Sequence, residues 1–265
     1  MKRWIPFLKS DPVVAVIRMQ GVIASGNRGT LSDQALAPAI ERAFSKGKPA
    51  AIALQINSPG GSPVQSSLIG SRIRRLADEK EVPVFAFVED VAASGGYWLA
   101  VAADEIFADP SSIVGSIGVI SAGFGAHELL SRHGIERRVY TAGKSKSMLD
   151  PFRPENEADV SRLKGILEDL HQNFIGQIKE RRGDKLNSDI DLFTGEVWLS
   201  AKAQELGLID GIGHLKGVMK DRFGDKVKFR TYGIKRPFLS RFSGRIIEDA
   251  IGSVEERAAY AQFGL

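Results

Sequence analysis

The chain has 265 residues, of which 43% are hydrophobic and 26% charged, so we expect one substantial folded domain with a smaller appendage. Its formal net charge of +4 is small, and Lys and Arg are interleaved with Asp and Glu rather than gathered in a basic block, so nucleic acid is not an expected partner. The chain has no cysteine, which excludes disulfides, thiolate catalysis and cysteine-based zinc sites.

The N-terminal segment begins with basic residues, but Lys9, Asp11 and Pro12 interrupt its apolar residues. No hydrophobic stretch of the length of a secretory signal follows it. No apolar run approaches the roughly 18 residues that a membrane span needs. We therefore expect a cytoplasmic protein without a signal peptide or a transmembrane helix.

Strand and helix patterns alternate along the first part of the chain. β-Branched residues predict one or two strands within residues 12–23, and Ser32 is the expected cap of a helix over residues 32–47. The same reasoning predicts further strands and helices, in chain order: a strand entering a tight loop (49–62), a helix (64–80), a strand (82–90), a helix (95–103), two strands (105–108 and 113–120), a helix (126–134) and a strand (136–143). This alternation predicts an α/β protein with mostly parallel strands.

Residues 155–182 are predicted to form the longest amphipathic helix, and the chain divides into a main domain (residues 1–235) and an amphipathic tail (residues 236–265). In the tail, apolar residues recur every three to four positions: Ile247, Ala250, Ile251, Val254 and Ala258. Such a stripe would pack on a second subunit or lie on an anionic membrane surface, next to the basic residues that precede it. We favour the subunit contact, because acidic residues in the tail would oppose membrane binding.

Ser94 follows a predicted strand and precedes two glycines and an apolar run. A glycine inside a helix costs roughly 0.5–1 kcal/mol relative to alanine, so a close approach or a sharp turn is expected here. Sites in open α/β sheets lie beyond the carboxyl ends of the strands. The amide of Gly95 would then point out of a helix N-terminus towards a developing oxyanion, beside Ser94 as a nucleophile. A simple N-cap role for Ser94 fits this segment equally well.

A second glycine-rich turn, Pro59-Gly60-Gly61, follows another predicted strand and should lie at the same edge of the sheet. The amide of Gly61 would supply the second donor of an oxyanion hole. A phosphate site is weakly supported, because the turn lacks the glycine spacing and the Gly-Lys-Ser/Thr sequence of nucleotide-binding loops.

A serine nucleophile needs a neighbouring base. Histidine is the usual choice, and the chain has four: His127, His133, His171 and His214. All four lie in predicted helices, where surface or packing roles are more common, and no pair has zinc-ligand spacing. Lys144 and Lys146 lie in a loop beside apolar residues, and burial would lower the pKa of a lysine enough for it to act as a base. Most lysines in such loops are solvated, which is the interpretation that the residues alone favour.

Three segments together resemble the S49 serine peptidases, the signal peptide peptidase A (protease IV) and SohB-like group. They are LQINSPGGSP, VEDVAASGGYWLAVAADEIFADPSSIVGSIGV and YTAGKSKSMLDPFRP, and their order and spacing match the family over roughly residues 12–232. The resemblance implies the Clp protease/crotonase fold of repeated β-β-α units, here with a C-terminal helical appendage. It also implies a serine/lysine dyad that needs neither a metal nor an organic cofactor.

Matched motif by motif, the resemblance implies that Ser94 is the nucleophile and that Lys146, the second lysine of GKSKS, is the general base. Ser116 in VGSIGV would orient the lysine amine, and Gly61 and Gly95 would bind the oxyanion. The expected reaction is the hydrolysis of peptide bonds in small or unfolded polypeptides through an acyl-enzyme. Remnant signal peptides are one candidate substrate. Typical bacterial members carry an N-terminal membrane anchor that this sequence lacks, which leaves the substrate open.

Two further expectations concern the pocket and the assembly. The helices that follow the two glycine turns would line a substrate pocket with Leu68, Ile69, Trp98 and Leu99, which predicts a preference for small or apolar side chains. Because the chain carries one copy of each motif, the resemblance implies a ring- or dome-shaped homo-oligomer. We expect an octamer whose sites take their serine and lysine from adjacent subunits.

Three alternatives stand beside this hypothesis. A crotonase-like enzyme would use the same two amides on an acyl-CoA thioester, without a serine nucleophile. A non-catalytic scaffold would keep the fold and bind a membrane partner. A Clp-type serine/histidine peptidase would use His127 or His133 in place of Lys146.

Overall fold

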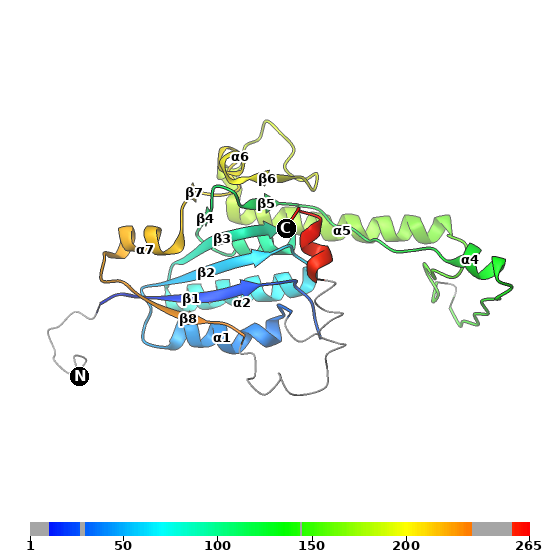
Figure 1. Cartoon of the computed structure of the whole chain (residues 1–265), viewed down its shortest axis with the longest axis horizontal. Helices are drawn as coiled ribbons and strands as arrows, with labels where there is room; N and C mark the ends of the chain where they lie inside the picture. Colours follow the sequence, from blue (N-terminus) through cyan, green and yellow to red (C-terminus); the bar gives the residue numbers. More distant parts are fainter. Residues whose placement is uncertain (1–10, 27–29, 144, 235–255) are drawn as a thin grey trace.

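A computed structural model of the chain describes residues 11–26, 30–143, 145–234 and 256–265. Its centre is an eight-stranded sheet in the order β6-β5-β3-β2-β1-β8, with β4 beside β3 and β7 beside β4 (Figure 1). The strands are β1 (Val13–Gln20), β2 (Ala51–Ser58), β3 (Val84–Ala93), β4 (Glu105–Ala108), β5 (Ile113–Gly115), β6 (Val197–Leu199), β7 (Gly211–Ile212) and β8 (Lys228–Tyr232). All neighbouring strands run parallel except β5 and β6.

Helices cover both faces of this sheet. They are α1 (Asp33–Ser45), α2 (Pro63–Lys80), α3 (Gly95–Ala100), α4 (His127–Arg132), α5 (Glu157–Arg182), α6 (Ser200–Glu205) and α7 (Leu215–Phe223). Residues of α1, α2 and α3 form one apolar core with one face of β1, β2 and β3, and α7 packs on the opposite face. Because both faces are covered, the central strands consist almost wholly of buried residues, as parallel sheets require.

The predicted α/β architecture with mostly parallel strands is confirmed. Ser32 caps α1 as expected, its hydroxyl accepting a hydrogen bond from the Ala35 amide. Between residues 183 and 234 the sequence predicts only a short helix that opens at His214, which corresponds to α7, whereas the structure also has a 3-10 turn (Gly183–Lys185), α6 and three strands there. Those elements are short, so their periodicity is weak.

Three predicted elements differ from the structure. The strand expected over residues 113–120 ends at Gly115, because Ser116 has a positive φ of 51° that turns the chain out of the sheet. The helix expected over residues 95–103 ends at Ala100. The strand expected over residues 136–143 is absent from the described residues there, because this segment lies away from the sheet and finds no strand to pair with.

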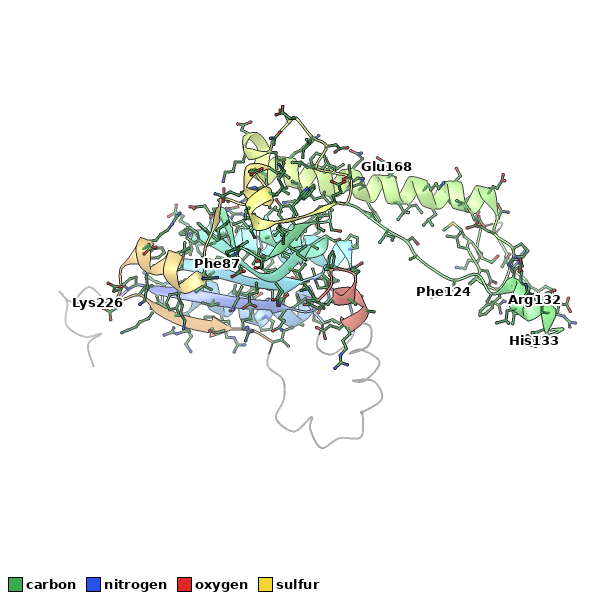
Figure 2. The ribbon with its side chains drawn as sticks, turned by 45° about the horizontal axis from the view of Figure 1, so that its top comes forward. Phe87, Phe124, Arg132, His133, Glu168 and Lys226 are labelled. Carbon is green, nitrogen blue, oxygen red and sulfur yellow. The ribbon has the colours of Figure 1, made fainter. Side chains whose placement is uncertain are left out.

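Residues 119–143 and 145–156, together with the first half of α5, extend away from the sheet; we call this part the arm (Figure 2). Phe124, Arg132 and His133 lie at its far end, and Glu168 lies where α5 leaves the body of the protein. Within the arm, the Ala126 amide donates a hydrogen bond to the Pro151 carbonyl at 2.7 Å. The loop that contains Lys146 therefore folds back on the start of α4.

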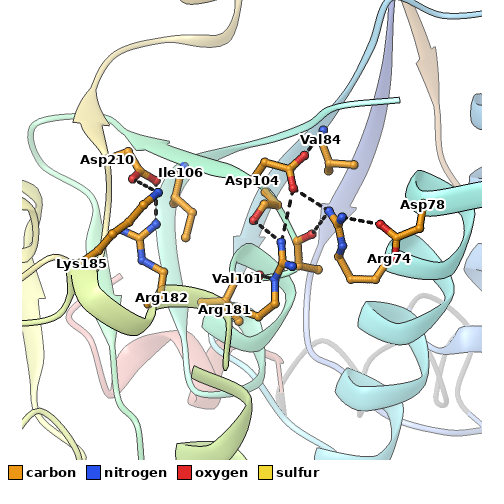
Figure 3. Close-up of polar contacts among 12 residues, drawn as sticks. Arg74, Asp78, Val84, Val101, Asp104, Ile106, Arg181, Arg182, Lys185 and Asp210 are labelled. Atoms are coloured by element: carbon orange, nitrogen blue, oxygen red, sulfur yellow. Dashed lines mark hydrogen bonds and ion pairs between the residues drawn. The ribbon is translucent and has the colours of Figure 1, made fainter. Parts of the chain in front are cut away.

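The C-terminal end of α5 is fixed to the body by two consecutive arginines (Figure 3). Arg181 donates to the carbonyl oxygens of Val101 and Ala103 at 3.0 and 3.1 Å. Arg182, only 4% exposed, donates to the Gly207 carbonyl and forms an ion pair with Asp210 at 2.7 Å. These contacts make the anchored end of α5 a rigid base for the arm.

The end of the chain, residues 256–265, packs on the sheet, and its helical turn ends in Tyr260 and Ala261. The Tyr260 hydroxyl donates to the Asn57 carbonyl at 2.7 Å, and burial raises the pKa of Tyr260 to about 12.

Ala258, the last member of the predicted apolar stripe, is exposed, whereas Ala259, Tyr260 and Phe263 are half-buried. The other residues of the stripe and the basic residues before it lie outside the described ranges, so the predicted subunit or membrane contact stays a prediction. Among the helices of the described residues, none is long and apolar enough to span a membrane.

We expect Asp210→Ala to lower the free energy of unfolding by about 3 kcal/mol, because it leaves the buried Arg182 guanidinium without its counter-charge. Burial opposes ionisation of Asp210, but hydrogen bonds from Arg182 and Lys185 hold its pKa below the ordinary value. A carboxyl with a lowered pKa contributes stability above its unfolded-state pKa and loses it as the pH falls through the folded-state pKa. Acid unfolding of the variant should therefore depend less on pH than that of the wild type.

The control is Glu205→Ala, which removes an exposed partner of Lys202 and should cost less than about 1 kcal/mol. Denaturant unfolding followed by circular dichroism at neutral and acidic pH measures both variants. Equal effects of the two substitutions would contradict the anchoring role of Asp210.

Candidate active site

Ser94 lies at the junction between β3 and α3, half-buried, with φ 51° and ψ −121°. A positive φ is unusual for a residue other than glycine and stores strain of about 1–3 kcal/mol, of the kind found where a nucleophile sits on a sharp strand-to-helix turn. Its amide donates to the Gly115 carbonyl at 2.8 Å. Its hydroxyl makes no capping hydrogen bond to α3, so the structure does not support a simple N-cap role.

The glycines around Ser94 are there because three stretches of backbone meet: the segment at Ile23, the turn after β2 and the start of α3. A Cβ atom on Gly60 would lie 2.8 Å from the Ser94 Cβ atom, and one on Gly61 would lie 2.0 Å from the Ile23 carbonyl oxygen. On the other side of the contact, a Cβ atom on Gly96 would lie 2.3 Å from the Ser58 carbonyl oxygen. No residue larger than glycine fits at these positions without moving the backbone. Gly60 and Gly96 thus allow the turn after β2 to meet the start of α3, and Gly61 allows the same turn to meet Ile23.

The amide nitrogen of Gly61 lies close to Gly95, the residue that follows Ser94. A Cβ atom built on Gly95 would lie 3.4 Å from the Gly61 amide nitrogen, which brings the two expected oxyanion donors together. Gly95 is the first residue of α3, so its N–H has no acceptor within the helix. Across the described residues, no hydrogen bond occupies the Gly61 N–H. Amides in this state at a helix N-terminus are suited to binding a developing negative charge.

α3 is held in place from inside the protein. Tyr97 is fully buried, and its hydroxyl donates to the Leu208 carbonyl at 2.7 Å. Burial raises the pKa of Tyr97, so the group stays a neutral donor. One residue on, Trp98 stacks on Phe174 of α5 with ring centroids 5.0 Å apart. These contacts fix the helix that begins at Ser94.

Ser116, expected to orient the lysine, is in the turn that directly follows β5. Its φ is also 51°, and its amide donates to the Glu196 carbonyl at 2.7 Å. The preceding residue, Gly115, accepts the hydrogen bond from the Ser94 amide. The structure therefore brings Ser94, Ser116, Gly61 and Gly95 to one edge of the sheet.

A cavity of about 390 Å³ opens between α2, α3 and α5 next to this edge. Seven residues line it: Pro63, Val64, Ser67, Leu68, Trp98, Leu170 and Asn173. Leu68 and Trp98 belong to the predicted pocket. Ile69 and Leu99 do not line it, because each faces the sheet from its helix and is fully buried in the core. Consecutive side chains of a helix point about 100° apart, so Leu68 and Ile69 face different surroundings. The sequence pattern did not show which of two adjacent apolar residues faces the cavity.

Lys146 lies in the loop of the arm and is exposed. The next residues fold on the arm: Arg162 of α5 contacts the Met148 sulfur at 3.9 Å. Arg162 lies nine residues before His171, or on the order of 14 Å along the helix axis at about 1.5 Å per residue. The arm with α4 extends away from β3 (Figure 1), so within one chain the Lys146 loop, which folds on α4, is not brought to Ser94. Lys144 lies outside the described residues.

The four histidines are divided between the arm and the body. His127 is the first residue of α4 and His133 directly follows this helix, so both lie in the arm. His214 pairs with Asp109 at 2.7 Å, and this hydrogen bond lowers the pKa of Asp109. His171 is half-buried on α5, and its Nε2 atom lies 3.1 Å from the Ile117 carbonyl oxygen, beside the Ser116 turn.

The sequence analysis treated His171 as an ordinary helix residue. A signal for its position was present, because it falls between Leu170 and Phe174 on the inward side of the predicted amphipathic helix. Within the described ranges, no group of three or more His, Asp or Glu side chains is arranged to hold a metal ion.

The strand order and the glycine-lined edge place the chain among proteins of the Clp protease/crotonase fold. Its structure is similar to that of a mutant of the 1510-N membrane-bound stomatin-specific protease, with a TM-score of 0.54 and 17% sequence identity over 86% of this chain and 100% of that one. The model of peptidase family S49 matches residues 77–224, more than half of the chain, a range that includes Ser94, Ser116 and Lys146. The chain belongs to peptidase family S49, as its motifs indicated.

Three relatives match most of this chain and are longer than it. A Brucella abortus protein named Na(+)/H(+) antiporter NhaA is 49% identical over 100% of this chain and 36% of its own length. The chloroplastic serine protease SPPA of Arabidopsis thaliana is 32% identical over 76% of this chain and 29% of its own length. The Haemophilus influenzae protein named "Probable protease SohB" is 30% identical over 77% of this chain and 57% of its own length. The chain thus spans less than two thirds of each of these relatives.

We expect Gly61→Ala to lower kcat/KM for peptide hydrolysis about a hundredfold, because the new Cβ atom would clash with the Ile23 carbonyl and displace the amide that lies next to Gly95. The matched control is Gly217→Ala in α7, where a Cβ atom would meet nothing within 4 Å. Activity on casein and thermal unfolding are measured for both. A Gly61→Ala enzyme with wild-type kcat/KM would show that this amide has no part in catalysis.

Proposed function

We propose that the chain is a serine endopeptidase in which Ser94 attacks the peptide carbonyl and Lys146 of a neighbouring subunit acts as the general base. One observation carries this proposal: Ser94 stands on a strained turn without a capping bond, directly before Gly95, and the Gly61 amide lies next to Gly95. A nucleophile and two convergent amide donors are what acyl transfer requires. Membership of family S49 supports the same assignment.

The reaction that follows is covalent. Neutral Lys146 takes the proton of the Ser94 hydroxyl as its oxygen forms a bond to the carbonyl carbon, and the amides of Gly61 and Gly95 stabilise the resulting oxyanion. The lysine then gives the proton to the leaving amine as the C–N bond breaks, which leaves an ester on Ser94. Water, deprotonated by the same lysine, hydrolyses this ester and releases the second product.

The arm supports a site shared between subunits. It carries Lys146 away from the Ser94 of its own chain and exposes several large apolar side chains: Ile120 (85%), Phe124 (94%), Leu129 (58%), Ile135 (56%) and Tyr140 (90%). Exposed apolar side chains gathered on one projection favour a contact with another protein. A second copy of the chain is the partner that would supply the missing half of the site. We propose a closed homo-oligomer, expected to be an octamer, in which each arm reaches the next subunit.

The cavity beside Ser94 suggests the class of substrate. Its lining includes Leu68, Trp98 and Leu170, and none of its seven lining residues is charged. We propose that it accepts a small or apolar side chain next to the scissile bond, in unfolded or small polypeptides that include remnant signal peptides. A peptide library digested by the wild type reads this preference directly, and cleavage confined to charged residues would contradict it.

Ser94→Ala should abolish hydrolysis, and its free energy of unfolding should change by less than about 1 kcal/mol, because the hydroxyl makes no capping bond. Lys146→Ala should be equally inactive. Lys146→Arg should fail as well, because a guanidinium stays protonated near neutral pH and cannot take a proton. Turnover of the library by purified variants, with calorimetry as the folding control, measures all three.

Substantial turnover by Ser94→Ala would refute the nucleophile, and an active Lys146→Arg enzyme would refute the dyad. Labelling of the wild type by a fluorophosphonate, absent in Ser94→Ala, separates the peptidase from a crotonase-like enzyme that needs no reactive serine.

Co-expression of Ser94→Ala and Lys146→Ala subunits should restore activity, because random assortment gives about a quarter of shared sites both intact residues. Each variant expressed alone is the control, and differently tagged subunits purified together prove that the oligomers are mixed. Mixed oligomers without activity would place the dyad within one chain, and an active monomer in sedimentation would rule out the shared site.

A further inference from the structure

The turn after β5, residues 115–118, is held from three sides. On the first side, the Ser94 amide donates to the Gly115 carbonyl. On the second side, the Ser116 amide donates to the carbonyl of Glu196, the residue before β6. The third comes from α5, where the Nε2 atom of His171 lies 3.1 Å from the Ile117 carbonyl oxygen. Among the described residues, no other side chain hydrogen-bonds to this turn. A substitution of His171 can therefore remove the contact and leave the two backbone hydrogen bonds in place.

The turn needs such support because its backbone is strained. Ser116 has a φ of 51°, and strain of this kind, about 1–3 kcal/mol, persists only where the surroundings fix the conformation. Ile117 is fully buried, so its carbonyl would be left without a partner if the imidazole were removed. The relaxation that follows would move the neighbouring Ser116 hydroxyl.

The same face of α5 contacts both sides of the site. Phe174, one helical turn after His171, stacks on Trp98 in the wall of the cavity. Leu170, directly before His171, lines that cavity as well. His171 is therefore placed between the substrate cavity and the turn of Ser116, on the helix that continues into the arm.

The chemistry of the contact fixes the role of the imidazole. A carbonyl oxygen can only accept a hydrogen bond, so the Nε2 atom of His171 must carry a proton and donate it. The neutral tautomer with a proton on Nε2 and the imidazolium both meet this requirement. The contact therefore does not depend on the charge of His171.

We propose that His171 is a positioning residue of the active site, which holds the Ser116 turn in the conformation that orients the lysine amine. This inference rests on the proposed serine/lysine mechanism. It assigns His171 no proton transfer to the substrate: the imidazole acts through Ser116.

The test compares two replacements of His171. His171→Leu removes the donor and keeps the side-chain volume, so kcat should fall about a hundredfold while KM stays within about twofold. His171→Gln places an amide nitrogen where the Nε2 atom was and should restore most of kcat. Gln172→Leu, on the exposed side of α5, is the matched control and should leave kcat unchanged.

A double variant separates positioning from general loss of structure. If His171 acts through Ser116, the double variant Ser116→Ala/His171→Leu should have the same kcat as Ser116→Ala alone. The double variant and Ser116→Ala should also shift the pH dependence of kcat to the same extent. If His171→Leu does not fold, His171→Asn replaces it, since its shorter amide cannot reach the Ile117 carbonyl.

A wild-type kcat for His171→Leu or His171→Asn would overturn the inference, as would effects that add in the double variant. An inactive His171→Gln enzyme with normal unfolding would also overturn it, because the donor would then be insufficient. These results leave the proposed function standing, provided that Ser94→Ala and Lys146→Ala are inactive. An active Ser94→Ala enzyme would instead refute the mechanism on which the inference rests.

Discussion

The contact between two backbone turns is the constraint on which the site depends. The turn after β2 lies between the start of α3 and Ile23 so closely that no Cβ atom fits at Gly60, Gly61 or Gly96, and the Ser66 side chain occupies the space at Gly95. The contact exists because β2 and β3 are parallel neighbours, with Ser58 paired to Ala92, so that both chains leave the sheet at the same edge. It brings the Gly61 amide next to Gly95, the residue that follows Ser94. The glycines are therefore a packing requirement first, and the two convergent donors follow from it.

α5 connects this edge of the sheet to the rest of the protein. Its C-terminal end is clamped through Arg181 and Arg182, its middle contacts the Ser116 turn and Trp98, and its N-terminal half extends into the arm. A helix of 26 residues is about 40 Å long, at about 1.5 Å per residue. A rigid rod of this length separates the Lys146 loop from the site of its own chain.

Long elements with clear periodicity were predicted well from the sequence, and short or unpaired ones were not. The central strands, α1, α2 and α5 lie where the apolar patterns put them. The strand expected over residues 136–143 is wrong because a strand needs a neighbour, which the arm does not provide. Ile69 and Leu99 were expected in the pocket, but a pattern of apolar residues does not distinguish a cavity wall from the core behind it. His171 was missed because its partner, a carbonyl oxygen 54 residues away, has no sequence signature.

The sequence by itself determined the α/β class, the two glycine turns and the serine that follows β3, because glycine, β-branched residues and helical spacing act through local backbone conformation. The S49 motifs identified the family on the same local basis. Only the tertiary structure decided which amides meet, that the Ser94 hydroxyl is uncapped, and that Lys146 lies on an arm away from it. Those facts depend on contacts between segments distant in the chain, which are set by how strands and helices pack and not by the residues of any one segment.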